Sequence, residues 1–278
     1  MKNLSKSLRK APVVLLLIAG GVITVFPFLY MISSALTPNL FVIPYPPELF
    51  PINASMDNFV KAWQANNFQA YFVNSAFVSI TATIITVIFS SMAAYAFARF
   101  QFRGKELFFF TFLVVMMVPA TILIIPQFLL MKGLGLRNSL PGLVLIYSAS
   151  SIPSGIFLLR GFFEQLPKEL EEAALLDGAN YFQIFFKVMM PLSAPGIATV
   201  AIFSFMGFWD EFIMALTFID DPAKRTLPIA IALFQGQHGT QWGLVFAASL
   251  IALVPILIVF FSLQKYFVGG ITAGSVKG

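Results

Sequence analysis

The sequence predicts an all-α, polytopic membrane protein with six transmembrane helices. Hydrophobic residues make up 59% of the 278-residue chain and charged residues 10%, and the mean hydropathy is +0.88. Soluble domains average about 45–50% apolar and about 25% charged residues. The higher apolar and lower charged fractions of this chain indicate a membrane protein. In addition, the apolar residues gather in six long segments that are nearly free of charge.

Each segment is long enough to span a membrane, because a helix needs about 20 apolar residues to cross the hydrocarbon core. The segments are 11–36, 72–98, 107–131, 139–159, 196–219 and 242–264. The first follows basic residues, as the apolar part of a signal peptide does, but it is far longer than the usual stretch of about 7–15 residues. We therefore expect it to remain as a membrane helix.

The distribution of Lys and Arg predicts how the helices are oriented. With the N-terminus inside, 12 of the 17 basic residues fall in inside segments. The outside segments hold the other 5, which are Lys61, Lys132, Arg137, Lys224 and Arg225. The protein is thus expected in the cell (inner) membrane with both termini cytoplasmic. Because the basic residues form no cluster, a nucleic-acid partner is not expected.

The spans divide the chain into three predicted parts. Residues 1–70 would form the first helix and a long outer loop, and residues 71–267 a core domain with a cytoplasmic loop at about 163–193. Residues 268–278 would form a cytoplasmic tail. The prolines inside spans three, four and six are expected to break or kink them, and these are Pro119, Pro126, Pro153 and Pro255.

The stretch LPKELEEAALLDGAN, residues 166–180, holds four of the chain's 12 acidic residues. Pro167 suits the first position of a helix, acids suit its first turns, and Gly178 suits its end. We expect a short helix over 167–178, followed by a redirection of the chain at Pro191 and Pro195. The pattern fits either a solvated loop helix or a helix that docks on a cytoplasmic partner.

The stretch EEAALLDGANYFQIFFKVMMPLSAPG resembles the loop signature of the permease subunits of ATP-binding-cassette (ABC) importers. In that signature Glu-Ala-Ala is followed by three residues, a Gly and, about a dozen residues later, a proline-containing turn. The segments SMAAYAFARFQFRGK, TLPIAIALFQGQHGTQWG and LQKYFVGGITAGSVKG resemble the carbohydrate-importing branch, in particular MalG-like subunits. The resemblance implies the type I importer permease fold.

The resemblance also implies which residues contact the ATPase. In this family the loop helix sits in a groove of a cytoplasmic ATPase subunit and transmits its closure to the membrane helices. The matching residues here are Glu172, Ala173, Ala174, Asp177 and Gly178. The tail of maltose-type subunits reaches the ATPase dimer interface, and the matching residues are Ser275, Val276, Lys277 and Gly278.

The partners implied are a second, MalF-like permease, two cytoplasmic ATP-binding subunits and an extracytoplasmic solute-binding protein, all in or at a lipid membrane. This chain has no G-x-x-x-x-G-K-[ST] motif, so ATP and Mg²⁺ are expected on the partner ATPase subunits. With no Cys and with His238 as its single His, the chain has neither a thiolate nor a multi-histidine metal site, and no enzyme activity is expected.

The fifth span contains FMGFWDEFIMAL, in which Asp210 and Glu211 are adjacent. A carboxylate inside a membrane is costly, so such residues usually face a cavity or a partner group. In one hypothesis these acids accept hydrogen bonds from sugar hydroxyls while Trp209 or Phe208 stacks on a sugar face. In the other they hold helices together. Asn74, in the most polar span, is a further pathway candidate.

The function expected from these observations is that of a permease subunit forming half of the pathway for a sugar or oligosaccharide. One alternative is the same architecture for another solute, such as glycerol phosphate or an amino acid. Another is a secondary transporter that carries protons on Asp210 or Glu211, which would work without any ATPase. A membrane-bound enzyme is a remote third option, because the sequence offers no metal or nucleophile cluster.

Overall fold

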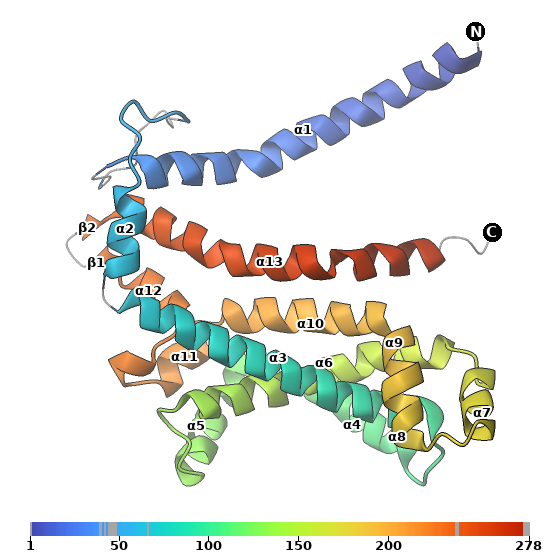
Figure 1. The fold of residues 1–278 in the computed structure, drawn as a ribbon. Coiled ribbons are helices and arrows are strands. Elements are labelled where there is room, and N and C mark those ends of the chain that lie inside the picture. The colour runs from blue at the N-terminus through green and yellow to red at the C-terminus, as the bar shows by residue number, and fades with distance from the viewer. Residues whose placement is uncertain are drawn as a thin grey trace. The chain divides into compact units, whose positions relative to one another are not determined.

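The computed structural model describes residues 2–38, 41, 43, 49–65, 67–236 and 239–274 (Figure 1). These residues are mainly helical, as predicted. In chain order the elements are α1 (Lys2–Leu36), α2 (Asp57–Gln64), α3 (Phe68–Arg99), α4 (Lys105–Met116), η1 (Ala120–Leu123), α5 (Ile124–Gly133), α6 (Leu140–Gln165), α7 (Glu169–Leu176), α8 (Tyr181–Ile184), η2 (Phe185–Met189), α9 (Met190–Leu192), α10 (Ala194–Trp209), α11 (Ile213–Phe218), η3 (Pro222–Lys224), α12 (Leu227–Ala232), β1 (Gln235–Gly236), β2 (Gly239–Thr240) and α13 (Trp242–Gly274).

Four continuous helices in the described residues are long and apolar enough to cross a membrane. They are α1 from Pro12 onward, α3, α6 and α13 up to Tyr266. These helices correspond to the first, second, fourth and sixth predicted spans. Pro153 and Pro255 lie inside α6 and α13, which continue past them.

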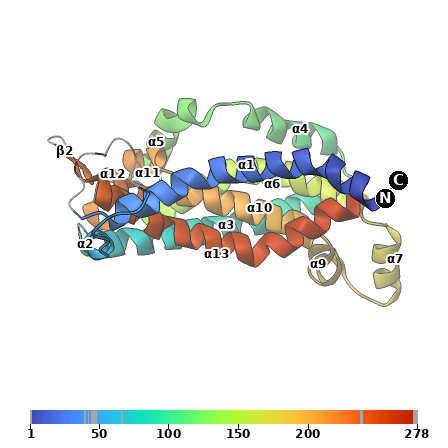
Figure 2. The ribbon, with the colours of Figure 1, turned by 90° about the horizontal axis from the view of Figure 1, so that it is seen from above.

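The other two predicted spans are not continuous helices. Span three is divided into α4 and α5, which are bent by 92° at a break next to Pro119, and Figure 2 shows the two helices joined by an extended segment. The proline at this break confirms the expected interruption, because its ring and missing N–H disfavour a continuing helix. Span five was predicted as one helix over 196–219, which is wrong: α10 ends at Trp209 and α11 begins at Ile213.

The chain forms two compact units, residues 1–69 with 230–253 and residues 70–229 with 254–278. In the first unit the buried Asn58 of α2 forms hydrogen bonds with the end of α1. Its side-chain amide donates to the carbonyls of Ala35 at 2.9 Å and Thr37 at 2.8 Å. Tyr30 of α1 packs edge-on against Phe246 of α13, with ring centroids 6.1 Å apart. The β1–β2 pair is antiparallel, with Gln235 opposite Thr240.

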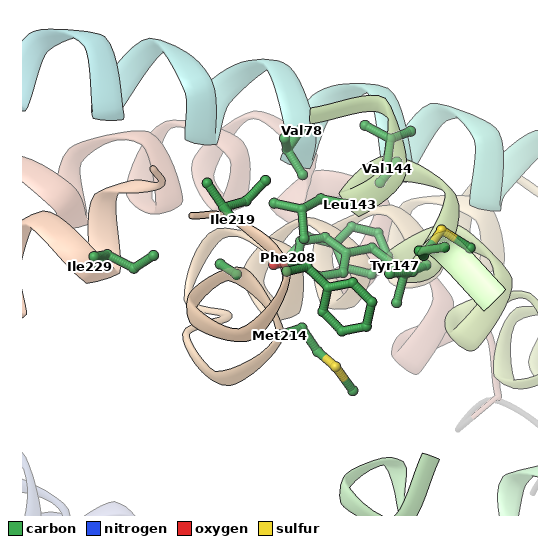
Figure 3. Packing of buried hydrophobic residues seen from close by; sticks show 13 residues of the cluster. Val78, Leu143, Val144, Tyr147, Phe208, Met214, Ile219 and Ile229 are labelled. Atoms are coloured by element: carbon green, nitrogen blue, oxygen red, sulfur yellow. The ribbon is translucent and has the colours of Figure 1, made fainter. Parts of the chain in front are cut away.

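In the second unit, α3, α6, α10 and α11 enclose an apolar core. Figure 3 shows side chains from these elements converging around Phe208 and Tyr147. The two rings stack with centroids 5.4 Å apart. The remaining labelled residues close the same cluster, and they are Val78, Leu143, Val144, Met214, Ile219 and Ile229.

A close approach of α3 and α6 depends on small residues. A Cβ added at Gly155 of α6 would lie 2.7 Å from the Cβ of Ser90 in α3, which is closer than such atoms come in proteins. Small residues are common at contacts between membrane helices, because packing there relies on close backbone approach. Gly155 therefore sets the distance between these two helices.

We predict that Gly155→Val destabilises the protein, because the new side chain cannot fit unless α3 and α6 separate. Overpacking of this kind costs about 1–3 kcal/mol. Gly161→Val is the matched control, since it lies in the same helix and a Cβ there has nothing within 4 Å. Thermal unfolding of both variants in detergent should show a lower midpoint for Gly155→Val. Equal midpoints would contradict the close contact.

Candidate functional sites

The loop helix α7 begins close to the predicted position but after Pro167. Leu166 has φ −73° and ψ 139°, an extended conformation that the residue before a proline prefers. The helix then begins at Glu169, with Lys168 at its N-cap, two residues later than predicted. Glu169, Glu171 and Glu172 occupy its first turn, where negative charge complements the helix dipole.

Gly178 ends α7, as predicted, by adopting a left-handed conformation with φ +84°. The N–H of Gly178 donates to the carbonyl of Leu175 at 3.0 Å, and the N–H of Ala179 donates to the carbonyl of Ala174 at 2.9 Å. These two bonds form a Schellman motif, which satisfies carbonyls at the end of the helix. A residue with a side chain would be strained at this φ.

The chain after α7 turns back toward the membrane helices through α8, η2 and α9. Asn180 and Gln183 form a reciprocal capping box at the start of α8, with both bonds 2.9 Å long. The helical segment Tyr181–Leu192 is then bent by 78° from α10. Pro191 and Pro195 flank this bend, in agreement with the predicted redirection.

Arg99, the last residue of α3, connects three elements. Its Nη2 donates to the carbonyl of Leu166 at the end of α6, with a separation of 2.6 Å. Its Nε lies 2.8 Å from Oε1 of Glu171 in α7. The side chains of Arg99 and Glu171 are 5% and 17% exposed, so water screens this ion pair little.

The Glu171 carboxyl experiences opposing effects. Burial raises its pKa above the usual value, while Arg99, the Tyr95 hydroxyl and Lys168 act to lower it. Without the arginine, this carboxyl would therefore take up a proton more readily. Arg99 thus favours the ionised form of Glu171 and keeps it available for the ion pair.

The five residues matched to the ATPase-contacting signature differ in exposure. Glu172, Ala173, Asp177 and Gly178 are exposed, whereas Ala174 is half-buried. Ala174 packs against an apolar cluster beneath α7 that is formed by α3, α6, α8, η2 and α10. The buried members of the cluster are Ala94, Tyr95, Leu159, Phe163, Ile184, Phe185, Met189 and Val200. The two alanines therefore face different sides, one inward and one outward.

The outward face of α7 is partly apolar. Leu176 is 89% exposed, and Leu170 and Leu175 are also exposed. In Figure 1, α7 lies at one end of its unit, beyond α8 and α9. The tail residues Ser275, Val276, Lys277 and Gly278, together with His238, lie outside the described residues.

The pathway candidates near residue 210 fall into two groups. Trp209 is 1% exposed and packs against Phe72 and Phe205, with ring centroids 5.4 and 5.6 Å away. Phe208 is also buried and stacks on Tyr147. Both rings are thus part of the core in this conformation.

The adjacent acids Asp210 and Glu211 lie at the break between α10 and α11, not inside a continuous helix as predicted. The Glu211 carboxylate accepts hydrogen bonds from the Tyr147 hydroxyl at 2.6 Å and from the backbone N–H groups of Met214 at 2.7 Å and Ala215 at 2.9 Å. It therefore connects α6 to the start of α11. Asp210 is exposed, and its side chain makes no hydrogen bond or ion pair within the described part of the chain.

Asn74, the fifth pathway candidate, is bound to the segment that follows α11. Its side-chain amide donates to the carbonyls of Ala223 at 2.9 Å and Arg225 at 3.0 Å. The neighbouring Ser75 accepts from the N–H of Leu227 at 2.8 Å. The two residues together hold the 223–227 segment against α3.

A partly open cavity of about 310 Å³ lies between η1, α6, α10 and α11. Of the five pathway candidates, Phe208 and Glu211 line it, whereas Trp209, Asp210 and Asn74 do not. Hydroxyl groups from other elements complete its polar lining, and they belong to Thr121, Tyr147, Ser150, Ser151 and Ser204.

Two of these features were not predicted from the sequence. They are the role of Arg99, which is only one of the 12 basic residues expected inside, and the roles of Tyr147, Ser150 and Ser151. No local pattern identifies them, because their partners lie far along the chain: the Arg99–Leu166 bond spans 67 residues and the Tyr147–Glu211 bond spans 64.

We predict that Glu211→Ala lowers the free energy of unfolding by on the order of 2 kcal/mol, because it leaves buried donors without their charged acceptor. Asp210→Ala is the matched control, and an exposed residue of this kind changes stability by about 0.5 kcal/mol or less. Chemical unfolding of both variants in detergent would measure the difference. Equal losses would contradict the assigned role of Glu211.

The comparisons with known proteins agree with this architecture. Residues 86–272 match the family model described as binding-protein-dependent transport system inner membrane component. The probable ABC transporter permease YurM of Bacillus subtilis is 39% identical over 253 residues, covering 91% of this chain and 84% of that protein. The trehalose/maltose transport permease MalG of Thermococcus litoralis is 38% identical over 273 residues, covering 95% and 97%.

A solved structure shares the fold. It is a chain in the crystal structure of a bacterial ABC transporter involved in the import of the acidic polysaccharide alginate. The TM-score is 0.82 at 24% identity, and the match covers 95% of this chain and 98% of that one. The chain therefore belongs to the family of binding-protein-dependent transport system inner membrane components, the permease subunits of ABC importers.

Proposed function

We propose that this chain forms half of the translocation pathway of an ATP-driven importer for a sugar or oligosaccharide, and that it is coupled to a separate ATPase through α7. The main support for the proposed coupling is the geometry of α7. It presents exposed acidic and apolar residues on its outer face while an ion pair attaches it to the ends of α3 and α6.

The proposed docking surface consists of Leu170, Glu172, Ala173, Leu176 and Asp177. Leu176 is 89% exposed, and the exposed Leu170 and Leu175 lie on the same short helix, so that the exposed surface of α7 includes several apolar side chains that a partner could cover. The ATPase groove that receives it would have an apolar floor and basic residues at its rim. ATP and Mg²⁺ would bind to the ATPase subunits, since this chain has no P-loop.

The complete importer would contain this chain, a second permease, two ATPase subunits and an extracytoplasmic solute-binding protein. The family description supports the binding-protein partner. We place both termini and α7 on the cytoplasmic side of the inner membrane, because 12 of the 17 Lys and Arg residues then lie inside. In this arrangement each of the two bent helix pairs counts as one span, which makes six.

A relative supports a carbohydrate substrate, since MalG of Thermococcus litoralis is the permease of a trehalose/maltose transport system. The 310 Å³ cavity is lined mainly by apolar residues, and it also contains the groups that sugars contact: several hydroxyls, the Glu211 carboxylate and aromatic rings. No Lys or Arg lines it among the described residues, which favours a neutral sugar over an anionic solute such as glycerol phosphate.

The docking surface is tested by Leu176→Glu. We expect this change to abolish co-purification of the ATPase and sugar uptake while the chain still inserts into the membrane, because a charge replaces the apolar contact. Ile52→Glu is the control, since Ile52 is 91% exposed in the predicted outer loop. ATPase retention by Leu176→Glu would refute docking at this surface, and uptake that persists without any ATPase would favour a proton-coupled transporter.

The cavity is tested by Ser150→Phe, which places a ring in the proposed sugar path. We expect uptake to fall strongly, because the ring would occupy the space through which the sugar passes. Ala149→Phe is the matched control, because Ala149 is exposed and does not line the cavity. Uptake of labelled sugar by proteoliposomes containing the whole importer measures both variants. Equal uptake would exclude the cavity from the path.

A further inference from the structure

Few interactions other than the Arg99 contacts attach α7 to its unit. The helix has no buried residue, and its main apolar contact inward is the single methyl group of Ala174. Three residues connect α6 to α7, and a glycine turn follows α7, so the flanking segments alone do not hold its orientation.

Arg99 provides additional contacts that hold α7 in its orientation. One guanidinium group makes two contacts: it donates a hydrogen bond to the Leu166 carbonyl at 2.6 Å and forms an ion pair with the Glu171 carboxylate, with Nε 2.8 Å from Oε1. Because the hydrogen bond to Leu166 holds the planar guanidinium in place, the charge that attracts Glu171 has a fixed position. The single apolar contact of Ala174 gives α7 no such charge-based anchor.

We propose that Arg99 is a positioning residue for coupling, which makes α7 move together with the cytoplasmic ends of α3 and α6. This inference rests on the proposed docking of an ATPase to α7. A displacement of α7 then reaches two membrane helices through one side chain. One of them, α6, contributes Tyr147, Ser150 and Ser151 to the cavity, so the same helix connects the loop to the proposed path.

The experiment compares variants of the complete importer in proteoliposomes. Arg99→Ala removes both the hydrogen bond and the ion pair, and Arg99→Lys keeps a cation for Glu171 but cannot also contact Leu166 with the same geometry. Arg103→Ala is the matched control, since Arg103 is an exposed arginine four residues further along. The quantities measured are ATPase co-purification, the rate of ATP hydrolysis, and the amount of sugar transported per ATP hydrolysed.

We expect Arg99→Ala to retain the ATPase and to hydrolyse ATP, while sugar transported per ATP falls about tenfold, within the range that coupling residues show. Arg99→Lys should recover part of this ratio, and Arg103→Ala should leave it unchanged. If Arg99→Ala fails to fold, Glu171→Gln provides the second test. It preserves the shape of the side chain, removes the ion pair, and should lower the same ratio.

An unchanged ratio in Arg99→Ala or Glu171→Gln would overturn the inference. So would loss of the ATPase from Arg99→Ala alone, because the arginine would then only order the helix for docking. Failure of the proposed function gives a different result: the unmodified chain itself would not retain an ATPase.

Discussion

The position of α7 in its unit depends on the hydrogen bond and the ion pair made by Arg99. These two contacts bring together the end of α3, the carbonyl of Leu166 directly after α6 and a carboxylate of α7. Without Arg99, the half-buried Glu171 carboxylate would lose the opposite charge that lies 2.8 Å away. Since α7 has few other contacts, the ion pair helps to determine the direction in which its outer face points.

Two pairs of adjacent acids show how the fold divides similar residues between different tasks. Glu171 pairs inward with Arg99, whereas the neighbouring Glu172 is exposed. In the same way Glu211 binds Tyr147 and the start of α11, whereas Asp210 is exposed. Glu171 and Glu172 are neighbours on a helix and point about 100° apart, so only one of them can face Arg99, whereas Asp210 and Glu211 diverge in the break between α10 and α11. The inward acid holds the structure, and the outward acid remains available for contacts.

The breaks in the predicted spans arise from local chemistry in one case and from tertiary contacts in the other. Pro119 interrupts span three through its ring and its missing N–H, which the sequence makes visible. No proline divides α10 from α11. There the Glu211 carboxylate accepts hydrogen bonds from the N–H groups of Met214 and Ala215, and α11 begins as a separate helix. A hydropathy pattern carries no sign of this, because apolar residues continue on both sides.

The sequence by itself determined the membrane class, the approximate position of each apolar segment, the acidic loop helix and the family. These properties follow from composition, from the length of apolar runs and from local rules for glycine and proline. Only the tertiary structure decided which polar groups meet, because partners such as Arg99 and Leu166 or Tyr147 and Glu211 are separated by more than 60 residues. Their meeting depends on how the helices pack, and no local pattern records that packing.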